Sequence, residues 1–252
     1  MAKSAWSEKM LQLLRRMNNF SLPGSCRPEC FRFEINDAQV GWIRPHVAPL
    51  LARHPEVFAP PHGGAVALRP GLDTYDRRSA AKYSVMPKFS DPPMMWMERA
   101  ATSLFGVKRG GVHINGYTVS EGGEVSMWLA RRSSTKQTYP GLLDNVPAVW
   151  LLASASNTPC YTYEEEDGVF AENQFVFDLE LPRDFKPRVG DGEVHEFYLL
   201  PIEKVKELLA TEDFKPNCAM VVLDFLIRHS FIEPDTEPCY QEFVAGLHQT
   251  LE

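Results

Sequence analysis

Three basic side chains follow one another closely near the middle of the chain, and their chemistry suits phosphate groups. Arg131 and Arg132 are adjacent, and Lys136 comes four residues later. An arginine can bind a phosphate through two parallel N–H···O bonds, whereas a lysine acts as a point charge. The solvated end of a strand would contain the same residue types. The pattern therefore leaves two interpretations open, a phosphate site and an exposed charged strand end.

The cysteines offer a second kind of chemistry, but their number and spacing give it little support. There are five, and they are scattered along the sequence, which argues against a disulfide framework. Only Cys26 and Cys30 lie close together, at a spacing that zinc sites also use. No second cysteine pair or histidine pair follows at zinc-finger spacing. We expect reduced, structural thiols here rather than a zinc site.

The elements that must position these side chains fall into two groups, and the first group predicts a small α/β unit over residues 1–105. Met10, Leu13, Leu14 and Met17 follow helical spacing, and apolar residues alternate with polar ones from Phe31 to Ile35. The predicted helices cover residues 7–19, 45–53, 73–81 and 94–102. The predicted strands cover residues 31–35, 40–43 and 65–68.

The second group begins at about residue 112 with a strand, a Gly122-Gly123 turn and a returning strand that ends near Arg131. Later strands are indicated by alternating apolar residues, and two helices by an apolar face. The predicted strands cover residues 112–119, 125–131, 169–181 and 196–200. The predicted helices cover residues 201–209 and 217–229.

Composition limits the classes of partner. The chain has 252 residues, 44% of them hydrophobic and 23% charged, which suits one large or two small globular domains with a real core. A net charge of −7 argues against a broad surface for nucleic-acid polymers or anionic membranes. The longest apolar stretch, Val146 to Ala155, is too short to span a bilayer.

The N-terminal stretch bears on location. It has no secretory apolar region, so we expect a cytoplasmic protein. The stretch from Ser7 to Asn19 is amphipathic and contains Arg15 and Arg16, which keeps a mitochondrial presequence open as an alternative. Glu8 counts against that alternative, because such presequences are poor in acidic residues.

The order of elements, with the segments Lys136–Asn145 and Gly192–Ile202, resembles the Nudix hydrolase family. More narrowly, the chain resembles the branch related to the N-terminal regions of fungal thiamine pyrophosphokinases, in which an extra α/β domain precedes the Nudix fold. Three further segments carry this resemblance: Ala100–Val107, His113–Tyr117 and Phe214–Ala219. It implies an α/β fold class, with an N-terminal α/β domain over residues 1–105 and an incomplete Nudix-like α/β/α sandwich over residues 106–252.

The catalytic motif of that family, the Nudix box, has the pattern G-x5-E-x7-R-E-U-x-E-E-x-G-U, where U is a bulky aliphatic residue. In the family its glutamates lie on one helix face and hold magnesium, which neutralises a diphosphate and helps to activate water. Gly190 and Glu196 match the first spacing, but Lys204 and Val205 then stand where Arg and Glu should be. No Arg-Glu-x-x-Glu-Glu run occurs in the sequence, so the box is absent.

The Nudix box is missing from the segment between Asn145 and Tyr161. A second abrupt join follows Ala81, where relatives have more helix and linker. Two clean internal losses indicate a splice variant or an imperfect gene model rather than slow decay. We expect residues 146–160, which contain Trp150, to pack poorly or form a makeshift strand, and to expose apolar surface.

The resemblance implies a magnesium cofactor and a small-molecule diphosphate substrate, either an oxidised guanine nucleoside diphosphate or a thiamine diphosphate analogue. For such a substrate we expect contacts at Arg131, Arg132 and Lys136, from their residue types, and at Tyr139, which flanks the lost motif and could shape a pocket only if that motif were present. Without the box we assign no catalytic residue and expect impaired or absent hydrolysis. The alternatives are a non-catalytic truncated isoform and a binding module built on the N-terminal domain.

The remaining acidic and imidazole side chains have ordinary interpretations beside functional ones. Glu193 and Glu196 sit where some Nudix folds supply an auxiliary metal-binding carboxylate, although surface charge explains them too. In the family the acidic run from Glu164 to Asp167 is a hairpin, so we expect an exposed turn there rather than a metal site. His113 lies in a predicted strand and His195 directly before one, and we expect structural or surface histidines rather than general bases.

Overall fold

The structure is a computed structural model that describes residues 2–72, 82–145, 155–190 and 192–250. It is a mixed α/β fold, as the sequence predicts. Backbone contacts divide the chain into two compact units, each assembled from separate segments. Unit 1 comprises Met1–Met17, Gly111–Cys160 and Gln174–Gln249. Unit 2 comprises Asn18–Gly110, Tyr161–Asn173 and Thr250–Glu252.

Unit 2 contains a three-stranded sheet in the order β2-β1-β3, with β1 antiparallel to β2 and parallel to β3. Asn36 (φ 49°) and Asp37 (φ 63°) form the β1–β2 turn, since a tight hairpin turn of this kind needs positive φ at both central residues. A separate antiparallel pair joins β4 and β5. The strands are β1 (Phe31–Ile35), β2 (Ala38–Ile43), β3 (Ala65–Ala67), β4 (Lys82–Val85) and β5 (Met95–Glu98). The helical elements are α2 (Ala48–Leu51) and the 3-10 turns η1 (Asn19–Ser21), η2 (Arg27–Glu29) and η3 (Arg99–Ala101).

The core of unit 2 is built on the inward face of β1 and β2 and extends to β4 and β5. Phe33, Ile43 and Val85 are all at most 1% exposed. The Phe33 ring packs against that of Phe105, with 4.8 Å between the ring centroids. A Cβ on Gly41 would lie only 2.1 Å from the backbone oxygen of Phe105, so the close approach of this segment requires glycine.

One helix prediction in this unit is too long and another is wrong. Of residues 45–53 only Ala48–Leu51 is α-helical, and turns flank it on both sides. Residues 95–98 form β5 instead of a helix, since pairing with β4 places Met97 inside and leaves Trp96 45% exposed. The helix predicted over residues 73–81 lies outside the described residues.

The larger sheet has the order β11-β7-β6-β10-β9, and β8 pairs with β7. This one sheet unites the early strand pair and the late strands, as the sequence predicts. Its strands are β6 (Arg109–Val119), β7 (Val125–Arg132), β8 (Leu143–Asp144), β9 (Cys160–Glu165), β10 (Gly168–Glu180) and β11 (Val194–Pro201). By their contacts, most of β9 and the first half of β10 are counted with unit 2. The expected hairpin is confirmed, because β9 ends at Glu165 and β10 begins at Gly168.

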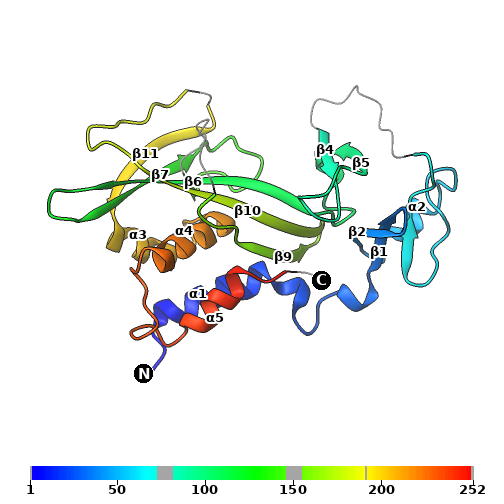
Figure 1. Ribbon diagram of the computed structural model, residues 1–252, viewed down its shortest axis with the longest axis horizontal. Coiled ribbons are helices and arrows are strands. Elements are labelled where there is room, and N and C mark those ends of the chain that lie inside the picture. Colours follow the sequence, from blue (N-terminus) through cyan, green and yellow to red (C-terminus); the bar gives the residue numbers. More distant parts are fainter. Residues whose placement is uncertain (1, 73–81, 146–154, 191, 251–252) are drawn as a thin grey trace. The chain divides into compact units, whose positions relative to one another are not determined.

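The helices of unit 1 are α1 (Ala5–Met17), α3 (Ile202–Leu209), α4 (Pro216–Arg228) and α5 (Tyr240–Leu247). Helix α3 packs on β7 and β11, whereas α4 contacts β8, α1 and α5. Figure 1 shows all four labelled helices on one side of the sheet strands of this unit. Helix α4 is the centre of this layer, since four consecutive residues, Met220 to Leu223, are fully buried. Helix α5 was not predicted, because its eight residues are too few to give a clear helical period.

Most of the segment expected to pack poorly, residues 146–154, lies outside the described residues, so its exposed apolar surface stays a prediction. Just after it, Asn157 forms an isolated bridge to Val176 of β10. Across the described ranges, no helix is long and apolar enough to cross a membrane.

Candidate functional site: a buried cluster beside helix α4

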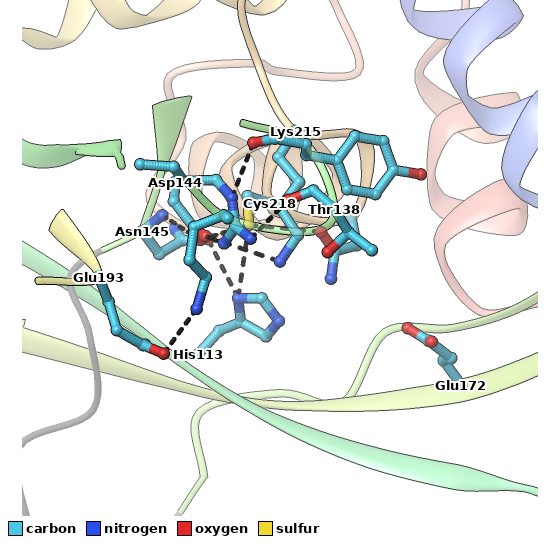
Figure 2. Close-up of polar contacts among 12 residues, drawn as sticks. His113, Thr138, Asp144, Asn145, Glu172, Glu193, Lys215 and Cys218 are labelled. Carbon is cyan, nitrogen blue, oxygen red and sulfur yellow. Dashed lines mark hydrogen bonds and ion pairs between the residues drawn. The ribbon is translucent and has the colours of Figure 1, made fainter. Parts of the chain in front are cut away.

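Three metal-ligand side chains converge inside unit 1, one from each of three elements. His113 lies on β6, Asp144 on β8 and Cys218 in the first turn of α4. Their ligand atoms all lie within 4.8 Å of one another, and no other group of three such side chains is found among the residues that the structure describes. Figure 2 shows the three side chains pointing toward one another.

Backbone pairing around β8 brings these elements together. Leu143 of β8 pairs with Arg131 of β7. Its N–H donates to the carbonyl of Asp213 at 2.7 Å, and its carbonyl accepts from the N–H of Lys215 at 3.0 Å. Pro216 then begins α4, a position where its missing N–H costs nothing. The first turn of α4 is therefore held next to β8.

The cluster is a chain of short polar contacts. The Cys218 thiol donates to Asp144 Oδ1 at 2.7 Å, and its Sγ lies 4.0 Å from His113 Nδ1. The same imidazole nitrogen lies 3.1 Å from Asn145 Oδ1. The amide of Asn145 continues the chain by donating to Asn115 Oδ1 at 2.9 Å. The five side chains therefore satisfy one another in the interior.

The two oxygens of Asp144 face different groups. Oδ1 faces the Cys218 thiol, whereas Oδ2 accepts from Arg132 Nη1 at 2.6 Å and lies 3.6 Å from Lys215 Nζ. Burial by itself raises the pKa of this carboxyl. The charge of Lys215 and the hydrogen bonds from Cys218 and Arg132 outweigh it, so the pKa lies below the usual value. Asp144 is therefore a buried carboxylate that two cations compensate.

His113 and Cys218 are pushed toward their neutral forms. Burial lowers the pKa of His113, and the charge of Asp144 only partly opposes this. Burial and then the charge of Asp144 raise the pKa of the Cys218 thiol well above its usual value. At neutral pH the cluster thus contains one carboxylate, a thiol and a neutral imidazole. This fits the structural role expected for His113, whereas no sequence pattern points to Asp144 or Cys218.

The predicted phosphate-binding arginines are engaged with protein acceptors. Arg131 donates to both oxygens of Asp213, at 2.5 and 3.0 Å, and to the carbonyl of Gly141. Arg132 donates to the carbonyls of Tyr139 and Thr138 at 2.9 and 2.8 Å. Tyr139 itself has a positive φ of 50°. The two arginines therefore hold the loop between β7 and β8.

The other predicted site residues lie apart from the cluster. Lys136 pairs with Glu193 at 2.5 Å. Glu196 on β11 accepts a hydrogen bond from the hydroxyl of Tyr198. The group of three ligand side chains found among the described residues includes neither glutamate. The prediction that Glu193 and Glu196 bind a metal rested on the family resemblance alone. In the structure Glu193 pairs with Lys136 and Glu196 with Tyr198.

The acidic run proves to have two parts. Glu165, Glu166 and Asp167 are exposed at the hairpin, as predicted. Glu164 is half-buried in unit 2, where it accepts the Cys26 thiol at 2.6 Å, and the Cys26 and Cys30 sulfur atoms lie 3.4 Å apart. Glu164 therefore anchors the η2 segment rather than joining a metal site.

Comparison with known proteins identifies the family of this chain. A family described as "Domain of unknown function (DUF4743)" matches residues 9–81 and 80–109. Nudix hydrolase 24, chloroplastic, of Arabidopsis thaliana is 32% identical over 256 residues, covering 82% of this chain and 70% of that protein. The chain belongs to the Nudix hydrolase family. The narrower relation to thiamine pyrophosphokinases stays a prediction from the sequence.

Two further family relatives are longer than this chain. Nudix hydrolase 20, chloroplastic, of Arabidopsis thaliana is 38% identical over 181 residues, which are 61% of this chain and 48% of that protein. The Saccharomyces cerevisiae protein named Uncharacterized protein YJR142W is 34% identical over 209 residues, 68% of this chain and 60% of its own length. The chain thus spans about half to three fifths of these two curated relatives.

Solved structures of Nudix proteins are also similar to parts of this chain. The Nudix hydrolase RenU from M. smegmatis covers 52% of it and 94% of RenU, at 12% identity and a TM-score of 0.32. The Nudix domain of Shewanella oneidensis NrtR, solved with ADP ribose, covers 51% of it and 91% of that domain, at 8% identity and a TM-score of 0.35.

The buried cluster does not fit the magnesium that this family implies. Magnesium prefers oxygen ligands and keeps several waters, whereas His113 and Cys218 offer nitrogen and sulfur. The only carboxylate, Asp144, already compensates Arg132 and Lys215. We therefore derive no reaction step through magnesium at this cluster.

Proposed function

We propose that this chain is a Nudix-family protein without magnesium-dependent diphosphatase activity. One observation carries the proposal: among the described residues, the only convergent group of three metal-ligand side chains contains a single carboxylate. The sequence agrees, since it has no acidic residue between Asp144 and Glu164, where the Nudix box should stand.

The remaining glutamates are a poor substitute for the box. Carboxylates that share a metal on a helix must be three or four residues apart. On α3, Glu203 and Glu207 have that spacing, but both are exposed and Glu207 is paired with Lys204 at 2.8 Å. Magnesium bound there would lie among lysines on an open surface, where water screens its field.

Residual diphosphate binding is the activity that we propose for Arg131, Arg132, Lys136 and Tyr139. A ligand would have to compete with the carbonyls and carboxylates that already hold the two arginines. Lys136 is the most accessible of the cations to a ligand, because its contact with Glu193 is an exposed pair of little strength. Binding of this kind, without transition-state stabilisation, gives little rate.

The larger organisation follows from the same proposal. Residues 1–105 would be the extra N-terminal domain of the thiamine pyrophosphokinase-related branch, and residues 106–252 a Nudix domain that lacks its catalytic helix. The chain would then be a truncated isoform, and its substrate class would be inherited from a parent enzyme that cleaves small-molecule diphosphates. We also propose a cytoplasmic location, with the mitochondrion as the alternative. Genomic sequence between the codons for Asn145 and Tyr161 tests the truncation directly, because a skipped exon would encode a glutamate-rich helix.

The activity proposal is tested by phosphate release from an oxidised guanine nucleoside diphosphate and from a thiamine diphosphate analogue. Each reaction is run with magnesium and with a chelator. We expect release at the rate of the protein-free blank in all four. Release that depends on magnesium and scales with protein concentration would refute the proposal.

A further inference from the structure

The cluster around Cys218 contains a donor set that suits a cation other than magnesium. Sulfur, imidazole nitrogen and carboxylate oxygen are together the ligands that zinc binds, commonly in tetrahedral sites. We propose that Cys218 Sγ, His113 Nδ1 and Asp144 Oδ1, with Asn145 Oδ1 as the fourth donor, form a binding site for a zinc-class divalent cation. The site goes beyond the activity proposed above and does not depend on it.

The distances support a common centre. Ligands about 2.0 to 2.3 Å from a tetrahedral zinc ion lie on the order of 3.5 Å apart. The contacts here are 2.7 Å for Cys218–Asp144, 3.1 Å for His113–Asn145 and 4.0 Å for Cys218–His113. They bracket that value, and side-chain shifts of about 1 Å would equalise them. The ligand atoms of His113, Asp144 and Cys218 all lie within 4.8 Å of one another.

Two of the proposed ligands can carry a negative charge beside the cation. When the cation enters, it takes the place of the thiol proton that Cys218 now shares with Asp144 Oδ1. The resulting thiolate and the carboxylate place two negative charges beside the cation, while Oδ2, the other oxygen of Asp144, still faces Arg132 and Lys215. Arg132 and Lys215 can keep their contacts with Oδ2 and orient the carboxylate, as hydrogen-bond partners of metal ligands commonly do.

The His113 imidazole also contacts a residue that would not itself bind the metal. Besides Asn145, the Gln174 side chain on β10 interacts with the His113 imidazole and favours its protonated form. Metal-ligating histidines use one ring nitrogen for the metal and the other for such a partner, which fixes the tautomer. Binding at Nδ1 would place the proton on Nε2. The amide of Asn115, on the same strand as His113, accepts from Asn145 and holds that fourth donor in place.

The position of the site defines its role. It joins β6, β8 and the first turn of α4, the most buried helix of unit 1. Cys218 is 0% exposed and His113 is 9% exposed, so the protein leaves little space for a substrate next to a bound cation. The site would therefore be structural, because closed zinc sites contribute directly to folding free energy.

Cobalt(II) is the probe of choice, since it occupies zinc sites and its bond to a thiolate gives an intense near-ultraviolet absorption band. Metal-free full-length protein is titrated with cobalt(II), and zinc is then added to displace it. We expect the thiolate band to saturate at one cobalt per chain and to disappear with zinc but not with excess magnesium. Absence of the band from the native chain would overturn the proposal.

Variants identify which thiol is responsible. Cys218→Ser should abolish the band, whereas the paired change Cys26→Ser with Cys30→Ser should leave it unchanged. Gln174→Ala should weaken cobalt affinity about tenfold or more, through loss of the outer partner of His113. A band that survives Cys218→Ser, or one that is lost in the Cys26/Cys30 variant, would place the metal elsewhere and overturn the proposal. If Cys218→Ser does not fold, cobalt affinity decides: it should fall in Gln174→Ala and stay unchanged in the Cys26/Cys30 variant, and an unchanged affinity in Gln174→Ala would overturn the proposal.

Discussion

Asp144 Oδ1 accepts the thiol proton of Cys218 at 2.7 Å, and this contact joins a two-residue strand to the first turn of the most buried helix of unit 1. A strand as short as β8 has little pairing of its own. Its place therefore depends on side-chain contacts of this kind and on its backbone bonds to the segment before α4. The cluster is consequently both a structural joint and the most chemically distinctive group of unit 1.

The joint should be sensitive to loss of Arg132. Arg132→Ala removes bonds to Asp144 and to two loop carbonyls, and leaves a largely buried carboxylate with only Lys215 as its cation. We expect a loss of about 3 kcal/mol in the free energy of unfolding, measured by urea denaturation. The matched control is Lys204→Ala, whose exposed pair with Glu207 should contribute less than about 1 kcal/mol. Equal effects of the two changes would contradict the role assigned to Arg132.

His113 should give the protein a measurable dependence of stability on pH. Burial lowers its pKa in the folded state below the usual value of about 6.5, so below that pH the unfolded chain binds a proton that the folded chain does not. Stability is then lost as pH falls from about 6.5 toward the folded pKa, at up to about 1.4 kcal/mol per pH unit.

Urea denaturation between pH 7.5 and 5 tests this dependence. His113→Gln should flatten the curve in that range, and the difference between the two proteins isolates His113 from the other histidines. Parallel curves would show that His113 keeps an ordinary pKa in the folded protein.

Gly41 should be irreplaceable in unit 2. Gly41→Ala would place a Cβ 2.1 Å from the carbonyl oxygen of Phe105, and backbone there must move. We expect destabilisation of about 3 kcal/mol, at the upper end for overpacking. Gly122→Ala is the control. The atom nearest to its added Cβ, Ser120 Oγ, is 3.7 Å away, so this substitution should change stability little. A thermal-shift comparison suffices, and similar melting temperatures would refute the close approach.

Glu164 should suppress the reactivity of Cys26. Burial raises the pKa of this thiol, and the hydrogen bond and charge of Glu164 raise it further. Because the thiolate is the nucleophile, Glu164→Gln should speed alkylation of Cys26 several-fold at pH 8. Peptide mapping after timed iodoacetamide treatment measures the rate, and fully buried Cys218 should stay slow in both proteins. An unchanged or slower Cys26 rate would contradict the contact.

The sequence predicts elements in which apolar residues recur regularly over many residues, and turns whose residue types favour positive φ. The alternation along β10 and the Asn36-Asp37 turn are local signals of this kind. β5 was mistaken for a helix, since its strand character comes from pairing with β4, which no local pattern reveals. Pairing in the tertiary structure decides short segments of either type.

The cluster was missed for a related reason. His113, Asp144 and Cys218 are far apart in sequence, and no spacing rule connects one histidine, one aspartate and one cysteine. A local signal was present on β6, where His113 and Asn115 alternate with apolar neighbours and so lie on one face. The phosphate-binding interpretation of Arg131 and Arg132 rested on residue type alone. The fold provides both with protein acceptors that the sequence does not reveal.

Insertion of a Nudix box tests the central claim most directly. The chain is compared with a version that carries a family Nudix box inserted after Asn145, and both are assayed for magnesium-dependent phosphate release from oxidised guanine nucleoside diphosphate and from a thiamine diphosphate analogue. The account predicts negligible turnover by the native chain and magnesium-dependent turnover by the version with the inserted box. Comparable magnesium-dependent turnover by the two proteins would contradict it.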